Sequence, residues 1–200
     1  KSNDNFTCRG DAEGCWEPAF TYHGFRYFQV EGLGYKPAAE DFTVKVVRTG
    51  VRTIGQFACA DPLVNDIHRI IVNTESSNLH SVPTDCPQRD ERMGWTGDAN
   101  VFSPTALRLA APYAFYAKYL HDMALEQATI GGDVPMVVPS FGLKMGVAVW
   151  GDVTTFIPWN MYQVDGDPAI LADHYDAMRG WVDHLERVDG DNPGWGTHMQ

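Results

Sequence analysis

The chain has 200 residues, of which 44% are hydrophobic and 20% are charged, and its formal net charge at pH 7 is −11. This length and apolar content suit one ordinary globular domain or two small ones with a buried core, and they exclude a disordered chain. The acidic balance argues against a nucleic acid or an anionic membrane as partner, because both need a basic face.

The N-terminal residues carry one Lys with no apolar segment behind it, so we expect no signal peptide within this sequence. The compartment stays open between cytoplasmic and periplasmic or secreted. No apolar run reaches the length that spans a bilayer. Cys8 and Cys15 flank a turn-rich loop between two short extended runs. A disulfide across a hairpin and two free thiols on neighbouring strands both remain open.

Short runs of alternating apolar residues predict β structure in the first part of the chain. Residues 24–30 and 41–47 alternate in this way, and residues 53–59 are suited to a further short strand. Turn residues separate these runs. The sequence therefore predicts the C-terminal part of a β-sandwich domain over residues 1–58, with partner strands missing from this chain.

From residue 59 onward the pattern becomes helical. Asp61-Pro62 and Asp167-Pro168 each combine an N-cap residue with Pro at the first helical position, and a third helix is predicted after Ala111-Pro112. Shorter helices are predicted over residues 98–109 and 154–164. The loops between them are long and rich in Gly, Pro, Trp and Asp, which is typical of functional loops on a helical scaffold. Helix pairs joined by such loops suit an α/α toroid.

The densest polar stretch is the acidic motif, residues 85–98, with the sequence DCPQRDERMGWTGD. Four carboxylates and two arginines suit the hydroxyls of a sugar, and a Trp face suits the apolar side of its ring. One carboxyl kept protonated by an apolar wall could act as a general acid. The alternative is a loop held by internal Arg–carboxylate pairs, and composition alone favours that alternative somewhat. Cys86 has no nearby His, which favours a small buried packing residue over a nucleophile.

A second aromatic concentration follows at residues 149–162. Trp150 precedes the predicted helix and is the better candidate for an exposed sugar-binding face, whereas Trp159 and Tyr162 are most simply core residues. The His residues show no metal-ligand spacing, and the Asp-Gly-Asp sequence at residues 165–167 lacks the rest of a calcium loop. We therefore expect neither a metal nor another cofactor.

The acidic motif resembles the signature of the bacterial α-L-rhamnosidases, inverting glycoside hydrolases with an (α/α)6-barrel catalytic domain. Residues 20–27 resemble a strand of the β-sandwich domain that precedes that barrel, and residues 149–152, 157–159 and 162–167 resemble later barrel motifs. The resemblance implies that residues 59–200 are the N-terminal part of the barrel. It also implies a rhamnoside as the carbohydrate substrate.

The same resemblance implies roles for six residues. Glu91 aligns with the general acid. Three residues align with those that hold the rhamnose hydroxyls, namely Asp85, Arg89 and Asp98. Two align with aromatic residues that line the pocket, namely Trp95 and Trp150. Asp90 and Arg92 receive no direct role.

An inverting glycosidase also needs a second carboxylate about 6.5–9.5 Å from the acid to activate water. Nothing after Asp152 matches the base of the family, so we expect that base beyond Gln200. The chain alone is then expected to be inactive and to expose apolar helix faces that favour self-association. Two other hypotheses remain, a non-catalytic carbohydrate-binding module and an α/α-toroid glycosidase of other sugar specificity. The sequence does not fix the aglycone or the linkage.

Overall fold

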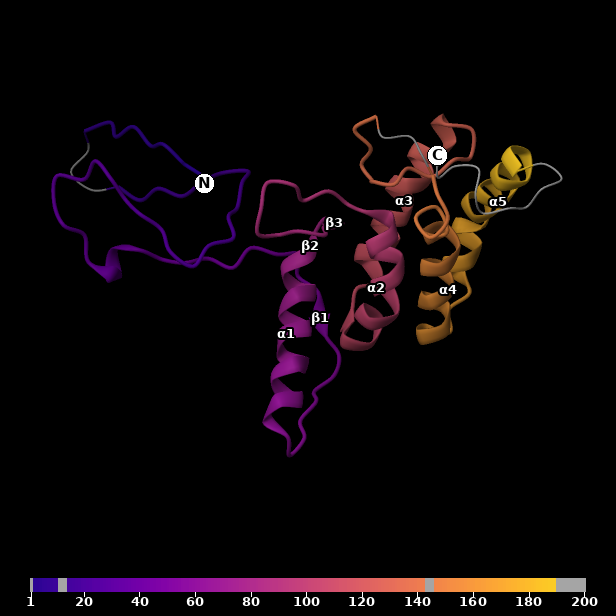
Figure 1. Ribbon diagram of the computed structural model, residues 1–200, viewed down its shortest axis with the longest axis horizontal. Coiled ribbons are helices and arrows are strands. Elements are labelled where there is room, and N and C mark those ends of the chain that lie inside the picture. The colour runs from indigo at the N-terminus through magenta and orange to yellow at the C-terminus, as the bar shows by residue number, and fades with distance from the viewer. Residues whose placement is uncertain (1, 11–13, 143–145, 190–200) are drawn as a thin grey trace.

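The computed structural model describes residues 2–10, 14–142 and 146–189. In this part of the chain the structure is mostly helical (Figure 1). Its α-helices lie where the sequence predicts them, so these predictions are confirmed. They are α1 Pro62–Asn78, α2 Thr96–Leu109, α3 Tyr113–Thr129, α4 Val153–Asp165 and α5 Ala169–Asp189.

The predicted N-cap signals account for two of the helix starts. Asp61 Oδ1 accepts a hydrogen bond of 2.9 Å from the amide of Leu63, and Pro62 occupies the first helical position. Asp167 Oδ1 accepts an equivalent bond of 2.9 Å from the amide of Ala169. Gly166 ends α4 with a φ of +74°, a left-handed conformation that glycine adopts without strain.

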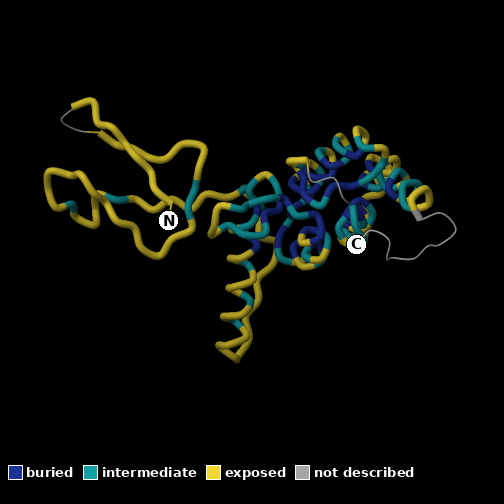
Figure 2. The backbone as a smooth tube through the Cα atoms, turned by 45° about the horizontal axis from the view of Figure 1, so that its top comes forward, coloured by how far each residue is buried: buried dark blue, intermediate teal, exposed yellow. Residues whose placement is uncertain are grey.

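The core lies between α2, α3, α4 and α5, where the tube in Figure 2 is buried over long stretches. Helix α3 contributes one buried face to this core, which includes Tyr116, Leu120 and Met123. The side chains with the least exposed surface come from all four helices and from the loop after α3. They include Leu107, Tyr116, Tyr119, Met123, Val134, Val138, Val153, Ile157, Met161 and Trp181.

Helix α1 is different, because its apolar residues remain exposed to solvent (Figure 2). Leu63, Ile67 and Ile70 are 65%, 48% and 55% exposed. After α1 the chain forms a tight antiparallel hairpin of β2 Leu79–His80 and β3 Val82–Pro83. A second two-stranded sheet pairs β1 Arg52–Thr53 with β4 Ala110–Ala111, which ties the segment before α1 to the end of α2.

The strands predicted at residues 24–30 and 41–47 do not form. Within the described residues, regular structure before β1 is confined to a 3₁₀ turn, η1 Ala39–Asp41. The strand predicted over residues 53–59 coincides with β1 only at Thr53. The reason is that a strand is held by hydrogen bonds to a neighbouring strand, and no described segment pairs with residues 24–30 or 41–47. Their apolar side chains are accordingly exposed, for example Tyr27 at 90% and Val46 at 86%.

Two smaller expectations concern the cysteines and membranes. Cys8 and Cys15 are both free and exposed, so the structure favours the two-thiol alternative over a disulfide. Among the described residues, no helix combines the length and the apolarity needed to cross a membrane.

Candidate functional site

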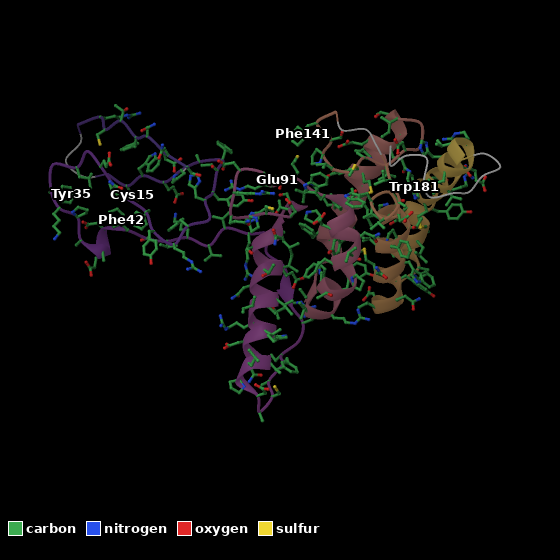
Figure 3. The ribbon with its side chains drawn as sticks, viewed as in Figure 1. Cys15, Tyr35, Phe42, Glu91, Phe141 and Trp181 are labelled. Carbon is green, nitrogen blue, oxygen red and sulfur yellow. The ribbon has the colours of Figure 1, made fainter. Side chains whose placement is uncertain are left out.

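The acidic motif runs from the end of β3 to the first turn of α2, and its second half is anchored to the core. The carbonyl of Gly94 accepts hydrogen bonds from the amide of Val138 and from the buried hydroxyl of Tyr119, both of 2.9 Å. The amide of Thr96 donates to the carbonyl of Met136 at 2.9 Å. Residues 94–96 are therefore fixed between α3 and the loop that follows it. Glu91 lies just before this anchor, where the β2–β3 hairpin meets α2 (Figure 3).

Glu91 is at the centre of a compact polar group. The indole Nε1 of Trp95 donates a hydrogen bond of 2.6 Å to Glu91 Oε1. Glu91 Oε2 and Asp85 Oδ1 are both buried and have no hydrogen-bond partner in the described part of the chain. The thiol of Cys86 donates to Asp85 Oδ2 at 2.9 Å. Carboxyl oxygens of Asp85 and Glu91 and the sulfur of Cys86 all lie within 4.8 Å of one another.

In this arrangement the pKa values of the two carboxyls shift in opposite directions. Burial, followed by the interaction with Asp85, raises the pKa of Glu91 above its ordinary value. Burial also disfavours the charge on Asp85, but interactions with Glu91, the Cys86 thiol and backbone amides outweigh it and lower the pKa of Asp85. Of the two carboxyls, Glu91 is therefore the one that binds a proton more readily and Asp85 the one that ionises first, which is how neighbouring carboxyls are divided into an acid and an anion.

Asp98 and Arg89 stand at the edge of this group. Asp98 is on the first turn of α2 and is an exposed residue. Neighbouring atoms nevertheless partly desolvate its carboxyl group. That desolvation and the charge of Asp85 raise the pKa of Asp98. Arg89 is exposed and interacts with the thiol of Cys86. Both side chains are thus near the carboxyl pair and open to solvent, where they can contact a ligand.

Trp150 reaches the same place from the loop before α4. A Cβ atom at Gly97 would lie 2.7 Å from the indole of Trp150, so the ring packs directly on the first turn of α2. Asn100 Nδ2 donates to the carbonyl of Val149 at 2.8 Å and holds the loop. Asp152 accepts from the amide of Val149 at 2.8 Å and from the indole of Trp181 at 3.0 Å. Asp152 therefore supports the Trp150 loop and is not part of the carboxyl group.

The structure thus brings together all six residues singled out from the sequence, and it changes the interpretation of two others. Cys86 is half-buried and bonded to a carboxylate, so the prediction of a buried packing residue is wrong. Trp159 is 50% exposed and not a core residue, because the outer face of α4 has no described neighbour to cover it.

The cluster of Asp85, Cys86 and Glu91 has the composition of a metal site but not its chemistry. Metal binding requires thiolate and carboxylate ligands, which must first lose their protons. Here the hydrogen bond to Asp85 raises the pKa of the Cys86 thiol and burial raises the pKa of Glu91, so both groups would give up their protons to a metal less readily. We therefore assign no metal to it.

The N-terminal segment contacts the acidic motif, which the sequence did not indicate. The ring of Tyr22 stacks on His80 with 4.1 Å between centroids, and the Arg92 guanidinium lies 3.9 Å from the Tyr22 centroid. A Cβ atom at Gly24 would lie 2.7 Å from the backbone of Gln88. The resemblance at residues 20–27 was the available signal, but it did not indicate which part of the site that segment would touch.

Comparison with known proteins places this geometry in a family. Residues 52–199 match the family model for the bacterial alpha-L-rhamnosidase 6 hairpin glycosidase domain, and residues 1–48 match that for the bacterial alpha-L-rhamnosidase concanavalin-like domain. An alpha-L-rhamnosidase of Streptomyces avermitilis is 41% identical over 187 residues, which are 93% of this chain and 18% of that protein.

Solved structures give the same result. The native alpha-L-rhamnosidase of Aspergillus terreus superimposes with a TM-score of 0.78 at 40% identity, over 84% of this chain and 20% of that one. The Streptomyces avermitilis enzyme in complex with L-rhamnose gives a TM-score of 0.67 at 40% identity, over 70% of this chain and 14% of that one.

The chain spans about a fifth of the length of the relatives it matches. Within that span the similarity includes both the helical part and the segment before it. This chain belongs to the bacterial α-L-rhamnosidase family, and its residues 52–199 match the six-hairpin glycosidase domain.

Proposed function

We propose that the protein carrying this sequence is an inverting α-L-rhamnosidase, which removes terminal α-L-rhamnose from glycosides or polysaccharides, and that Glu91 is its general acid. One observation carries this proposal: burial and the neighbouring Asp85 raise the pKa of Glu91, whose carboxyl accepts a hydrogen bond from Trp95 close to the α2 turn on which Trp150 packs. A carboxyl with a raised pKa is suited to carry the proton that it gives to the departing glycosidic oxygen. The rhamnose complex of the Streptomyces relative supports the choice of sugar.

The surrounding residues suit the recognition of a deoxy sugar. We propose that Asp85, Arg89 and Asp98 bind hydroxyl groups of the rhamnose, because ionised carboxylates accept and a guanidinium donates in bidentate fashion. We propose that Trp95 and Trp150 cover its apolar parts, including the C6 methyl group. Trp95 also orients the Glu91 carboxyl through its hydrogen bond to Oε1, although this bond by itself lowers the pKa of Glu91.

The catalytic base is proposed to lie outside residues 1–200. No carboxylate beyond Asp152 matches the base of the family, and the chain spans only about a fifth of its relatives. An inverting mechanism needs a carboxylate about 6.5–9.5 Å from the acid on the opposite side of the sugar. Without it, we expect the isolated chain to show no turnover.

We also propose the finer architecture. Residues 1–58 would be the C-terminal part of a β-sandwich domain and residues 59–200 the N-terminal part of an (α/α)6 barrel. The unpaired, exposed apolar segments before β1 support the first assignment, and the packed helices α2 to α5 support the second. The pairing of β1 with β4 indicates that the last residues before the boundary already contact the helical part.

The exposed apolar faces lead to a proposal about the isolated chain. Besides the α1 face, an open groove of about 400 Å³ between α4 and α5 is lined mainly by apolar side chains, including Phe156, Trp159 and Tyr175. Such faces favour association. We expect light scattering to report oligomers of the isolated chain, whereas a monodisperse monomer would contradict this proposal.

The test of Glu91 uses the full-length protein and two rhamnosides that differ in leaving group. An alkyl rhamnoside needs protonation of its leaving oxygen more than a nitrophenyl rhamnoside does. We expect Glu91→Gln to lower kcat/KM for the alkyl substrate by about 10²- to 10⁴-fold, and less for the nitrophenyl substrate. Asp90→Asn is the matched control, because Asp90 is exposed and adjacent in sequence.

Three results would redirect the proposal. Equal losses with both substrates would remove Glu91 from the role of acid. Calorimetric binding of rhamnose with no turnover in the full-length protein would favour a carbohydrate-binding module. Preference for another sugar in a panel of chromogenic glycosides would favour a different α/α-toroid glycosidase. Product NMR that shows the inverted anomer would support the stereochemical part.

A further inference from the structure

Arg92 directly follows the proposed acid, but its charge is directed elsewhere. Its guanidinium carbon lies 3.9 Å from the centroid of the Tyr22 ring, and that ring stacks on His80 at 4.1 Å with 12° between the planes. Tyr22 belongs to the N-terminal segment and His80 to β2, so three separate segments meet here. A cation over an aromatic face is attracted by the electron density of the ring. We call this group of Tyr22 and His80 the aromatic clamp.

The backbone and the side chain of Arg92 are both unusual. Its φ is +54°, a left-handed conformation that residues other than glycine adopt at a cost in energy. Its Nε atom is buried without a hydrogen-bond partner, and no described carboxylate lies within ion-pair distance of its guanidinium. An arginine next to two carboxyls would ordinarily pair with one of them. The stack on Tyr22 is therefore the contact that fixes its side chain.

The position of this charge is important for an acid catalyst. A cation within about 4–6 Å of a carboxyl favours the ionised form and would draw the proton from Glu91. We propose that Tyr22 and His80 are positioning residues, which hold the Arg92 guanidinium away from Glu91 and Asp85 so that the acid keeps its proton. This inference rests on the proposed role of Glu91. It assigns to the segment before the helical part a function in the chemistry of the site.

Several titratable groups besides Arg92 lie near Glu91 and the aromatic clamp. Asp85, Cys86 and Arg89 are on the same loop, and Asp98 is on α2. His80 is on β2, where burial and the Arg92 charge lower its pKa, so it favours the neutral form beside the arginine. A change at Tyr22 leaves Asp85, Cys86, Arg89 and Asp98 in place and removes only the stacking partner of His80, which makes it the most direct perturbation of Arg92.

The experiment measures kcat/KM against pH in the full-length protein with an alkyl rhamnoside. The alkaline limb of that profile reports loss of the proton from the acid in the free enzyme. In Tyr22→Leu, Arg92 is free to approach the carboxyls, and we expect the limb to move by about one pH unit toward lower pH. Tyr22→Phe keeps the aromatic face, and its limb should stay near that of the wild type.

The same substitution in an Arg92→Gln variant distinguishes an effect of the Arg92 charge from a general structural effect. In Arg92→Gln the guanidinium is absent, so adding Tyr22→Leu should not move the limb any further. An equal shift in both backgrounds would overturn the proposal, as would a loss of activity in Tyr22→Leu that is uniform at all pH values.

A spectroscopic readout separates failure of the clamp from failure of the proposed function. Infrared difference spectra between the wild type and Glu91→Gln follow the protonated Glu91 carboxyl without any turnover. If the band titrates at lower pH in Tyr22→Leu, the clamp is supported even if the protein hydrolyses no rhamnoside. If the band titrates identically in both, the clamp is refuted regardless of activity.

Discussion

Glu75 on α1 is a buried carboxyl whose ionisation should destabilise the fold. The residue is 3% exposed, its Oε1 atom has no hydrogen-bond partner in the described part of the chain, and it lines a small cavity with Arg48, Val72 and Leu109. Burial raises the pKa of Glu75 from 4.5 to about 7. The folded state therefore holds a proton that the unfolded state releases.

The sign and size of the effect follow from that difference. Below pH 4.5 Glu75 is protonated in both states, and there is no penalty. As the pH rises from 4.5 to about 7, the unfolded state ionises first, and stability falls by about 1.4 kcal/mol per pH unit, or about 3 kcal/mol in all. Above pH 7 the full penalty remains.

Glu75→Gln removes this ionisation while keeping the shape of the side chain. We expect urea unfolding to show that the variant gains stability over the wild type between pH 4.5 and pH 8 by about 3 kcal/mol at most. Glu186→Gln, at an exposed position on α5, is the control and should leave the pH dependence unchanged. Parallel stability curves for the wild type and Glu75→Gln would refute the reasoning.

Two further predictions concern the support of the site. Gly97→Ala places a methyl group 2.7 Å from the Trp150 indole, so the ring must move. We expect calorimetry to show weaker rhamnose binding, and the free energy of unfolding to fall by about 1–3 kcal/mol. Gly55→Ala, whose new methyl group meets nothing within 4 Å, is its control. Asp152→Ala leaves the Trp181 indole unpaired in the core, and thermal unfolding should show a loss of about 1–3 kcal/mol.

The helices were predictable because their signals are local. Asp61-Pro62 and Asp167-Pro168 carry both the cap and the first helical position within two residues, and the caps form as expected. The strands failed for the opposite reason. Alternation at residues 24–30 specifies which side chains share a face, but a strand exists only with a partner, and no described segment provides one.

The same distinction between local signals and long-range contacts applies to the residues of the candidate site. Asp85, Glu91 and Trp95 lie close together because they share one short loop, so the resemblance of that single motif was enough to select them. Trp150 was selected for its place before a helix, and its packing on Gly97 depends on the fold of the whole α2–α4 region. Tyr22 could not be assigned to the motif, because the contact joins segments about 70 residues apart.

The net charge of −11 does not indicate how the carboxylates and arginines of the acidic motif are arranged. Four carboxylates and two arginines could neutralise one another, and the sequence alone somewhat favoured that interpretation. The structure instead keeps Arg92 on an aromatic ring and leaves Asp85 and Glu91 to face each other. On our proposal, keeping the Arg92 charge away from this pair favours the protonated form of Glu91, while Arg89 stays beside the Cys86 thiol. The chemistry of this loop therefore depends as much on where its cations are held as on where its carboxyls lie.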